Sequence, residues 1–382
     1  MPNTLQAAIP KILAGGLAIL RKRTVMPSLI RTDFSNEAAQ KGDTIDLRDL
    51  ETPDVRDVSP SNTPPSTGDT ELEKVSITLD NWKEAPFYMD DKDLMEAVDG
   101  VVPDQVEKAA KKLAEQINKD IFSTYYRVYN HVGSAGSTPF STDYSDASAA
   151  RKTMNNNEVP ISDRRLVIDP DAEENAINLS SFADASFADD DSVITDGQIG
   201  RKVGFDFVMD QQVPSHTAGS LTGDPTVSGS HTAGIGAKSI TIATDSGDAV
   251  SLNQGDIVTF AGDTQTYAAT ADLSLGASAS GELKIEPGLQ VDLSGGEALS
   301  LDEGSDHVVN LAFHRDAFGL AVRPLADVVE DEIAVVRTMT DPLTGIPLRL
   351  EVKREHKRTQ WSFDVLYGTQ SIDPRLAVRL KG

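Results

Sequence analysis

The residue types that most often carry catalysis or bind metals are sparse in this chain, and their spacing matches no known site. The chain contains no cysteine, which excludes disulfides, thiolate nucleophiles and cysteine-based zinc sites. None of the histidines belongs to an H-E-x-x-H motif or has a second histidine four residues away, as in a helical zinc site. The histidines are His131, His216, His231, His307, His314 and His356. Because His307 and His314 flank an apolar run, we interpret them as polar residues at the ends of a strand.

Acidic and glycine-rich segments also lack the spacing of ligand sites. Asp189–Asp191 suggests calcium binding, but the alternating ligands and final glutamate of an EF-hand loop are absent. In segment 234–239 the lysine does not directly follow a glycine, as a phosphate-binding loop requires, and the glycines of 197–204 do not have dinucleotide-fold spacing. No serine stands in a G-x-S-x-G motif. We therefore predict a protein that is not an enzyme and uses no cofactor and no metal ion.

The chain is strongly acidic, with a formal net charge of −25. A protein of this charge repels polyanions, so if it lies beside nucleic acid it should enclose the nucleic acid rather than bind it tightly. Two short basic segments, Arg21–Arg23 and Lys353–Arg358, are predicted to meet acidic patches on neighbouring protein. The apolar run Ile12–Leu20 is shorter than the about 20 residues that span a bilayer. It predicts a short amphipathic helix packed on protein, with a peripheral membrane helix as the alternative.

Alternating segments predict a β ribbon near the C-terminus. Leu348–Val352 and Trp361–Tyr367 alternate apolar and polar residues, and the charged segment 354–359 between them predicts a hairpin tip. Upstream, Thr44–Leu47 and Val75–Leu79 predict two more strands. The proline-rich stretch that joins them is too long to lie inside a compact domain, so we expect a projecting hairpin.

The longest helix is predicted over 103–130. Apolar residues recur there at intervals of three and four, which indicates one buried stripe. These residues are Val106, Ala110, Leu113, Ile117 and Ile121. At 1.5 Å per residue the helix would be roughly 40 Å long. Since parts near both ends of the chain would share a layer with this helix, we expect a discontinuous domain with insertions.

The composition changes over 226–302, where small and polar residues dominate. Short strands separated by turn signals such as Gly255-Asp256 predict an inserted all-β module, a barrel or a sandwich. Its predicted strands are 239–243, 257–260, 266–269, 283–285 and 298–301. Mixed helical and strand segments are predicted on either side of the module: 145–155, 165–169, 171–179 and 205–209 before it, and 308–313, 317–323 and 333–338 after it.

Several short motifs, taken in order along the chain, resemble the major capsid proteins of tailed bacteriophages. They are Thr24-Val25-Met26, Leu29-Ile30-Arg31, Lys41–Thr44, Gly197–Phe205 with Val213-Pro214, Asn310–His314 with Ala317-Phe318, and Val365–Gly368 with Asp373-Pro374 and Ala377-Val378. The module departs from the minimal capsid protein. At Gly255–Gly262 it is similar to the inserted β domain of the coat protein of short-tailed phages in the Salmonella phage group.

The resemblance implies an α+β fold of the Hong Kong 97 type, with an inserted all-β domain. Its parts would be an N-terminal arm at 1–43, an extended loop at 44–80, a peripheral domain with a long spine helix at 81–132, an axial domain at 133–225 and 303–340, the inserted domain at 226–302, and the peripheral β ribbon with the C-terminus at 341–382.

The resemblance also implies self-assembly. Copies would form the pentamers and hexamers of an icosahedral shell that encloses double-stranded DNA without binding it specifically and without a membrane. Expected partners besides other copies are a portal protein and, because only a short segment precedes the first predicted strand, a separate scaffolding protein with little or no cleavage of the chain. The expected location is the virion, assembled in the cytoplasm of a host bacterium. Candidate contact residues are Lys353, Arg354, Lys357, Arg358, Trp361, Arg21, Arg23, Asp54 and Asp57.

Two other classes of protein stay open. A phage tail, decoration or host-adhesion protein built on β modules would form a trimer or a fibre. A secreted hydrolase with a carbohydrate-binding β domain would carry a signal peptide and a catalytic constellation.

Overall fold

The chain forms two compact units, each assembled from distant segments of sequence. The computed structural model describes residues 3–34, 39–50, 72–90, 104–183, 197–229, 234–302, 305–325, 334–341, 345–356 and 358–382. Unit 1 comprises 1–21, 32–113 and 319–372, and unit 2 comprises 22–31, 114–318 and 373–382. This discontinuity agrees with the expected layout, while the finer division into seven segments stays a prediction.

The predicted ribbon is confirmed as part of a six-stranded sheet in unit 1. β22 (Pro347–Arg354) pairs antiparallel with β23 (Arg358–Ser371), placing Val352 opposite Trp361. The strand order is β1-β20-β23-β22-β21, and β4 also pairs with β23. The other strands are β1 (Arg31–Phe34), β4 (Asn81–Asp90), β20 (Phe318–Arg323) and β21 (Ala334–Thr340).

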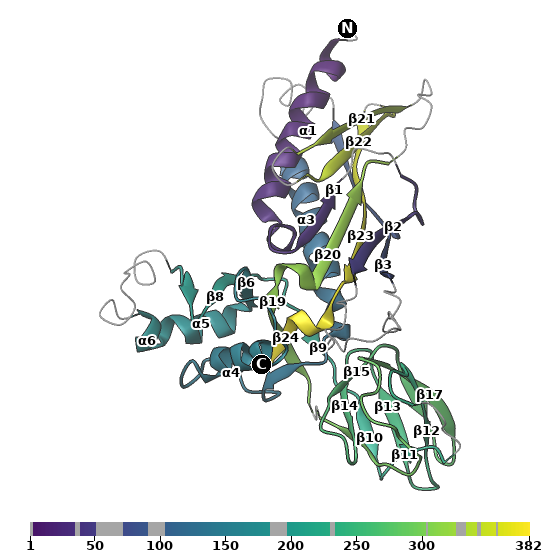
Figure 1. Ribbon diagram of the computed structural model, residues 1–382. Helices are drawn as coiled ribbons and strands as arrows, with labels where there is room; N and C mark the ends of the chain where they lie inside the picture. The colour runs from purple at the N-terminus through teal and green to yellow at the C-terminus, as the bar shows by residue number, and fades with distance from the viewer. Residues whose placement is uncertain are drawn as a thin grey trace, which may run out of the picture. The chain divides into compact units, whose positions relative to one another are not determined.

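An N-terminal helix packs on this sheet. α1 (Asn3–Arg23) buries Ile12, Leu13 and Leu17, and it is longer than the predicted apolar run (Figure 1). Gly16 allows the close approach, because a Cβ atom there would lie 2.8 Å from the Cζ atom of Phe363 in β23. The apolar stripe is therefore used for packing within the subunit. No helix in the described part of the chain is both long and apolar enough to cross a bilayer.

The predicted spine helix is present but shorter than expected. α3 (Asp104–Phe122) is followed by the 3-10 helix η2 (Ser123–Arg127). Asp104 and Glu107 stabilise its first turn through the helix dipole. All five residues of the predicted stripe are buried. The α-helix spans about 28 Å at 1.5 Å per residue, because the chain tightens into η2 and then becomes extended.

The predicted hairpin is confirmed near its base. β2 (Thr44–Leu50) and β3 (Leu72–Thr78) pair antiparallel, with Ile45 opposite Ile77. Ile77 and Leu79 pack in a buried cluster with Leu366 of β23. Gly368 permits this contact, since a Cβ atom there would lie 2.2 Å from the carbonyl oxygen of Thr78. The stretch 51–71 lies outside the described residues.

Unit 2 contains a seven-stranded sheet covered by helices. Its strand order is β5-β24-β19-β6-β8-β7, with β9 paired to β19. The strands are β5 (His131–Gly133), β6 (Arg164–Ile168), β7 (Arg201–Lys202), β8 (Phe205–Met209), β9 (Ser215–His216), β19 (His307–His314) and β24 (Ala377–Lys381). The helices are α4 (Ser145–Asn156), α5 (Pro170–Asn178) and α6 (Ser180–Ala183). Short 3-10 helices are η1 (Met26–Ser28), η3 (Arg315–Ala317) and η4 (Pro374–Leu376).

The core of this region agrees with the predicted elements around the module. Ala147, Ala150 and Met154 of α4 pack against Leu166 of β6 and Phe205 of β8. His307 and His314 are the first and last residues of β19, as the sequence predicted. The acidic loop of 182–191 falls mostly outside the described residues.

The inserted module is a closed β-barrel. Six strands follow the order β11-β12-β17-β15-β14-β18. The two edge strands then meet, because Val227 N–H donates to Glu297 O at 2.8 Å and Leu299 N–H donates to Pro225 O at 2.8 Å. The strands are β11 (Thr226–Val227), β12 (Ser239–Ala243), β14 (Ile257–Phe260), β15 (Tyr267–Ala269), β17 (Ser280–Glu286) and β18 (Leu299–Leu301).

A small second sheet belongs to the same module. β10 (Ser220–Thr222), β13 (Ala249–Leu252) and β16 (Leu273–Leu275) form it in that order. All five predicted strands are present, whereas these three and β11 were not predicted. Because β10 pairs with β13, the folded module begins before the expected boundary at residue 226. Val227, Ile240, Phe260, Tyr267 and Leu283 are among the buried residues of its apolar core.

Candidate assembly interface

Three of the predicted contact residues lie together at one end of the ribbon. Lys353 and Arg354 close β22, Arg358 opens β23, and all three are exposed. Arg358 Nε donates to Glu355 Oε2 at 2.7 Å, and this hydrogen bond raises the pKa of the guanidinium. Arg354 donates to the Thr359 hydroxyl at 3.0 Å. The end of the ribbon thus presents basic groups to solvent. Lys357, the fourth predicted contact residue of this segment, lies outside the described residues.

Trp361 has a different place from the one predicted. Its side chain is completely buried in unit 1, where its ring stacks on Phe87 of β4 with centroids 6.4 Å apart. A side chain with no exposed surface cannot contact another subunit without unfolding its own sheet. Trp361 is therefore a core residue of the ribbon, and its prediction as a contact residue was wrong.

The remaining predicted contact residues are dispersed. The guanidinium of Arg21, at the end of the unit 1 part of α1, forms an ion pair with the buried carboxylate of Asp341, and Arg21 Nε donates to Asp341 Oδ2 at 3.1 Å. The backbone carbonyl of Arg23 in unit 2 accepts a hydrogen bond from Asn118 at 3.3 Å. Arg21 therefore serves the fold of its own unit, and Asp54 and Asp57 lie outside the described residues.

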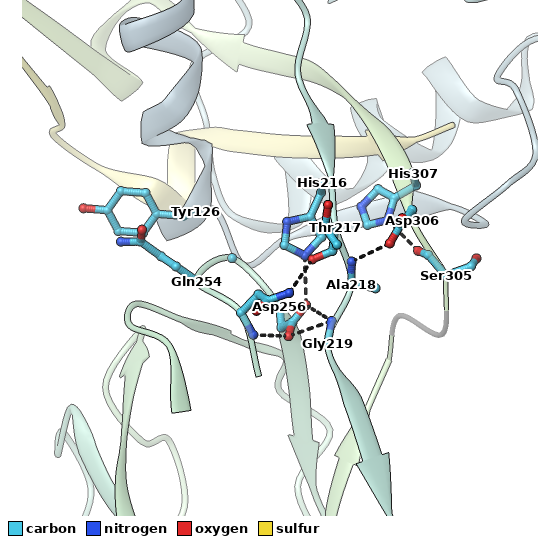
Figure 2. Close-up of polar contacts among 12 residues, drawn as sticks. Tyr126, His216, Thr217, Ala218, Gly219, Gln254, Asp256, Ser305, Asp306 and His307 are labelled. Carbon is cyan, nitrogen blue, oxygen red and sulfur yellow. Dashed lines mark hydrogen bonds and ion pairs between the residues drawn. The ribbon is translucent and has the colours of Figure 1, made fainter. Parts of the chain in front are cut away.

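A buried polar joint that sequence reasoning missed holds the barrel to the adjacent sheet of unit 2 (Figure 2). Its centre is Asp256, which is completely buried and directly precedes β14. Its carboxylate accepts from His216 Nε2 at 2.8 Å, from Asn253 N–H at 2.7 Å and from Gly219 N–H at 3.1 Å. With Nε2–H donating to the carboxylate, His216 Nδ1 accepts from the Tyr125 hydroxyl at 2.9 Å.

An arginine from the C-terminal strand completes the joint. Arg379 of β24 is completely buried, and its guanidinium donates to Gly255 O at 2.6 Å and to Tyr126 O at 3.3 Å. It also lies 5.1 Å from the centre of the Tyr125 ring, within cation–π range. The residue next to Asp256 is therefore tied directly to the last strand of the chain.

A second polar cluster joins the end of the barrel to the same strand. Asp302 Oδ2 lies 2.7 Å from His131 Nε2 and 2.9 Å from Lys381 Nζ. The hydrogen bond from His131, followed by that from Lys381, holds the pKa of Asp302 well below its usual range against the opposing effect of burial. Both ends of the inserted module are thus anchored by charge-assisted hydrogen bonds.

The side chains of Tyr125, His216 and Asp256 are hydrogen-bonded in the order of a hydrolase triad, but a substrate cannot reach the histidine. The histidine of a triad must reach the leaving group of a bound substrate, because it returns the proton to that group. His216 is 2% exposed and Asp256 is not exposed at all. The arrangement therefore positions backbone and side chains at the joint. Two features of the sequence pointed weakly to this joint. One is the pair Gly255-Asp256, which was interpreted as a turn, and the other is the alternation of Arg379 and Lys381 with apolar residues.

The Asp302 cluster predicts a specific response to acid. A carboxyl group whose folded pKa is depressed contributes stability above its unfolded pKa of about 4, and this contribution is lost as the pH falls through the folded pKa. Wild-type protein should therefore exceed Asp302→Asn in urea stability at pH 6, and the difference should shrink steadily below about pH 4. Asp306→Asn, an exposed carboxylate nearby in sequence, serves as the control. A difference that stays constant from pH 6 to pH 3 would contradict this assignment.

Comparison with known proteins identifies the family. A family model described as phage capsid protein matches residues 73–277, more than half of the chain. This chain belongs to the phage capsid protein family. The match runs from β3 through α3 and the strands and helices that follow it into the inserted barrel.

Solved structures with similar folds include phage capsids. The capsid of cyanophage P-SCSP1u is 13% identical, with a TM-score of 0.49, and the match covers 94% of this chain and 88% of that one. The Mycobacterium phage Che8 structure is 15% identical, with a TM-score of 0.47 and coverage of 89% and 85%. The capsid of an empty GTA particle is 10% identical, with a TM-score of 0.47 and coverage of 94% and 89%. No curated protein sequence matches the chain.

The capsid protein has the α+β organisation that was expected for this family. The N-terminal helix, hairpin, spine helix, ribbon and sheet of unit 2 are all present, and the barrel is added between β9 and β19. The particular likeness to the coat protein of short-tailed Salmonella-type phages stays a prediction.

Proposed function

We propose that the protein is the major capsid protein of a tailed phage and that it acts as a structural subunit rather than an enzyme. Identical copies would form pentamers and hexamers of an icosahedral shell that encloses double-stranded DNA. The observation that carries this proposal is the capsid family match over 73–277, which includes the hairpin strand β3 and the spine helix.

The charge distribution supports enclosure of DNA rather than binding. A net charge of −25 gives no sequence-independent attraction to phosphate groups. The exposed basic residues of the ribbon end, Lys353, Arg354 and Arg358, suit acidic surfaces on neighbouring copies instead. Such pairs set the register of a contact more than its strength. Weak contacts suffice, because many act together around a closed shell.

Electron microscopy of the purified protein, alone and with the scaffolding protein that we propose as a partner, tests this function. Closed shells of uniform diameter are the expected result. Fibres or isolated trimers would instead identify a tail or adhesion protein.

Within an infected cell, the proposed course is assembly in the bacterial cytoplasm, with a portal protein at one vertex, and residence in the virion.

Assembly is expected to accelerate when salt or a divalent cation is added. Subunits of net charge −25 repel one another, and this repulsion is screened beyond about 8–10 Å at physiological ionic strength. Light scattering at 20 mM and 200 mM NaCl, with the same protein concentration, measures the effect. Faster assembly at the lower salt concentration would show that attraction between charged patches outweighs the net repulsion.

A further inference from the structure

One face of β4 carries two large aromatic side chains that the described residues of unit 1 leave about half exposed. Residues alternate along this strand, with Phe87 and Met89 buried and their neighbours exposed. Trp82 is 48% exposed and Tyr88 is 46% exposed, and Pro86 between them is exposed as well. We call Trp82, Pro86 and Tyr88 the aromatic stripe. It extends over about 20 Å at the rise of a β-strand.

The Trp82 end of the stripe is held in place by a buried ion pair. Its indole N–H donates to Asp364 Oδ2 at 2.9 Å. Arg349 clamps that carboxylate with bonds of 2.6–3.0 Å, and its guanidinium carbon lies 5.7 Å from the centre of the Trp82 ring. The ring is therefore fixed from below while half of its surface faces water.

The Tyr88 end is held in a similar way. The guanidinium of Arg358 lies 4.4 Å from the ring centre, in cation–π contact. Arg358 is itself fixed by its 2.7 Å hydrogen bond to Glu355. Single exposed aromatic residues are ordinary on protein surfaces. Here, however, two exposed aromatic residues lie on the same strand, and each is in contact with an arginine. Interface hot spots have this composition and rigidity.

We propose that the aromatic stripe is a contact surface for a second copy of this chain. This inference rests on the proposed shell function. Two half-exposed aromatic rings and a proline offer at most a few hundred Å². A stable stand-alone complex buries about 800 Å² on each partner. The stripe is too small to hold a separate partner, and it suits one of many weak contacts repeated around a shell.

Charges on the same face favour protein over nucleic acid as the occupant. Glu84 lies between the two aromatic residues on β4 and Asp90 follows Tyr88, and both carboxylates are exposed. Lys353 and Arg358 lie at the ribbon end beside them, with Arg358 directly opposite Asp90. The two carboxylates would repel phosphate groups, whereas a surface of mixed sign can pair with the surface of an identical copy.

The absence of cysteine in the chain provides a direct test. Glu84→Cys places one thiol between the two aromatic residues and leaves both in position. Its reaction with a maleimide should be at least tenfold slower in assembled shells than in free subunits, and it should recover when the shells are dissociated. Equal rates in shells and subunits overturn the proposal, and so does protection of free, unassembled subunits by a protein other than this chain.

A pair of tyrosine variants provides a second readout. Tyr88→Ala should raise the lowest protein concentration that assembles by about tenfold, which is 1.4 kcal/mol per subunit, without changing the melting temperature of the free subunit. Tyr144→Ala removes a tyrosine of matched exposure, 45%, and should leave assembly unchanged. Equal effects of the two variants overturn the proposal.

The two proposals fail in distinguishable ways. If wild-type protein forms no shells by electron microscopy, the proposed function fails first and the inference falls with it. If wild-type shells are normal and the thiol of the Glu84→Cys variant reacts as fast in shells as in free subunits, the inference alone is rejected.

Discussion

Asp256→Ala is expected to lower the folding stability of unit 2 by about 3–5 kcal/mol, the cost of removing one partner from a buried charged network. The substitution leaves His216 Nε2 and the backbone N–H groups of Gly219 and Asn253 without their acceptor in a buried site. Each buried donor without a partner costs about 1–3 kcal/mol. Urea unfolding, combined with hydrogen exchange of peptides from β14 and β19, should show the loss on both sides of the joint.

The matched control for this experiment is Asp306→Ala. Asp306 also accepts a backbone hydrogen bond close to the joint, from Ala218 N–H at 2.9 Å, but its side chain is exposed. Its loss should cost below about 1 kcal/mol, because water replaces the missing partner. Equal effects of the two substitutions would mean that the buried carboxylate does not hold the joint together.

Asp364→Ala is expected to have a comparable effect on unit 1, about 3–5 kcal/mol. Arg349 and Asp364 have side chains only 7% and 5% exposed, so the substitution leaves a buried guanidinium without its counter-ion. The indole N–H of Trp82 loses its acceptor as well. Tryptophan fluorescence during urea unfolding measures this loss directly, because Trp82 and Trp361 are the only tryptophans in the chain and both belong to unit 1.

Two further variants separate charge from packing at this site. Glu351→Ala removes a carboxylate that is 45% exposed and 4.0 Å from Arg349, and it should change stability by no more than about 0.5 kcal/mol. The double variant Arg349→Met, Asp364→Leu should recover much of the stability that Asp364→Ala loses, since no charge remains buried alone. A double variant less stable than the single one would show that shape, not the lone charge, dominates.

Periodicity predicted the elements in which one face is buried and the other is wet. The stripe of α3, the helix α4 and the outer parts of the ribbon strands, 350–353 and 358–363, follow this rule, and each was found close to its expected position. β24 escaped prediction because all five of its residues are buried, including Arg379 and Lys381. The alternation of Arg379 and Lys381 with apolar residues is typical of a strand with one exposed face, whereas both faces of β24 are covered.

The contact residues were harder to predict than the fold. Alternation in β23 separates Trp361 and Phe363 from Ser362, but it does not say which face other elements will cover. α1, from far upstream, packs on the aromatic face, and Phe87 of the neighbouring strand β4 lies beside Trp361 on the same face. For the same reason the exposed side chain of Trp82 was not predicted. Its exposure depends on its position in β4, a strand that the sequence analysis did not predict. The joint around Asp256 depends on residues from four distant segments, a combination that no local pattern records.

Closure of the barrel has a consequence for crowding. An open sheet presents a row of backbone donors and acceptors that recruits strands from other molecules, and the bonds between β11 and β18 leave no such row on this ring of strands. Barrels brought to very high local concentration therefore offer this ring of strands no edge for exchange, which keeps productive packing separate from aggregation through the ring.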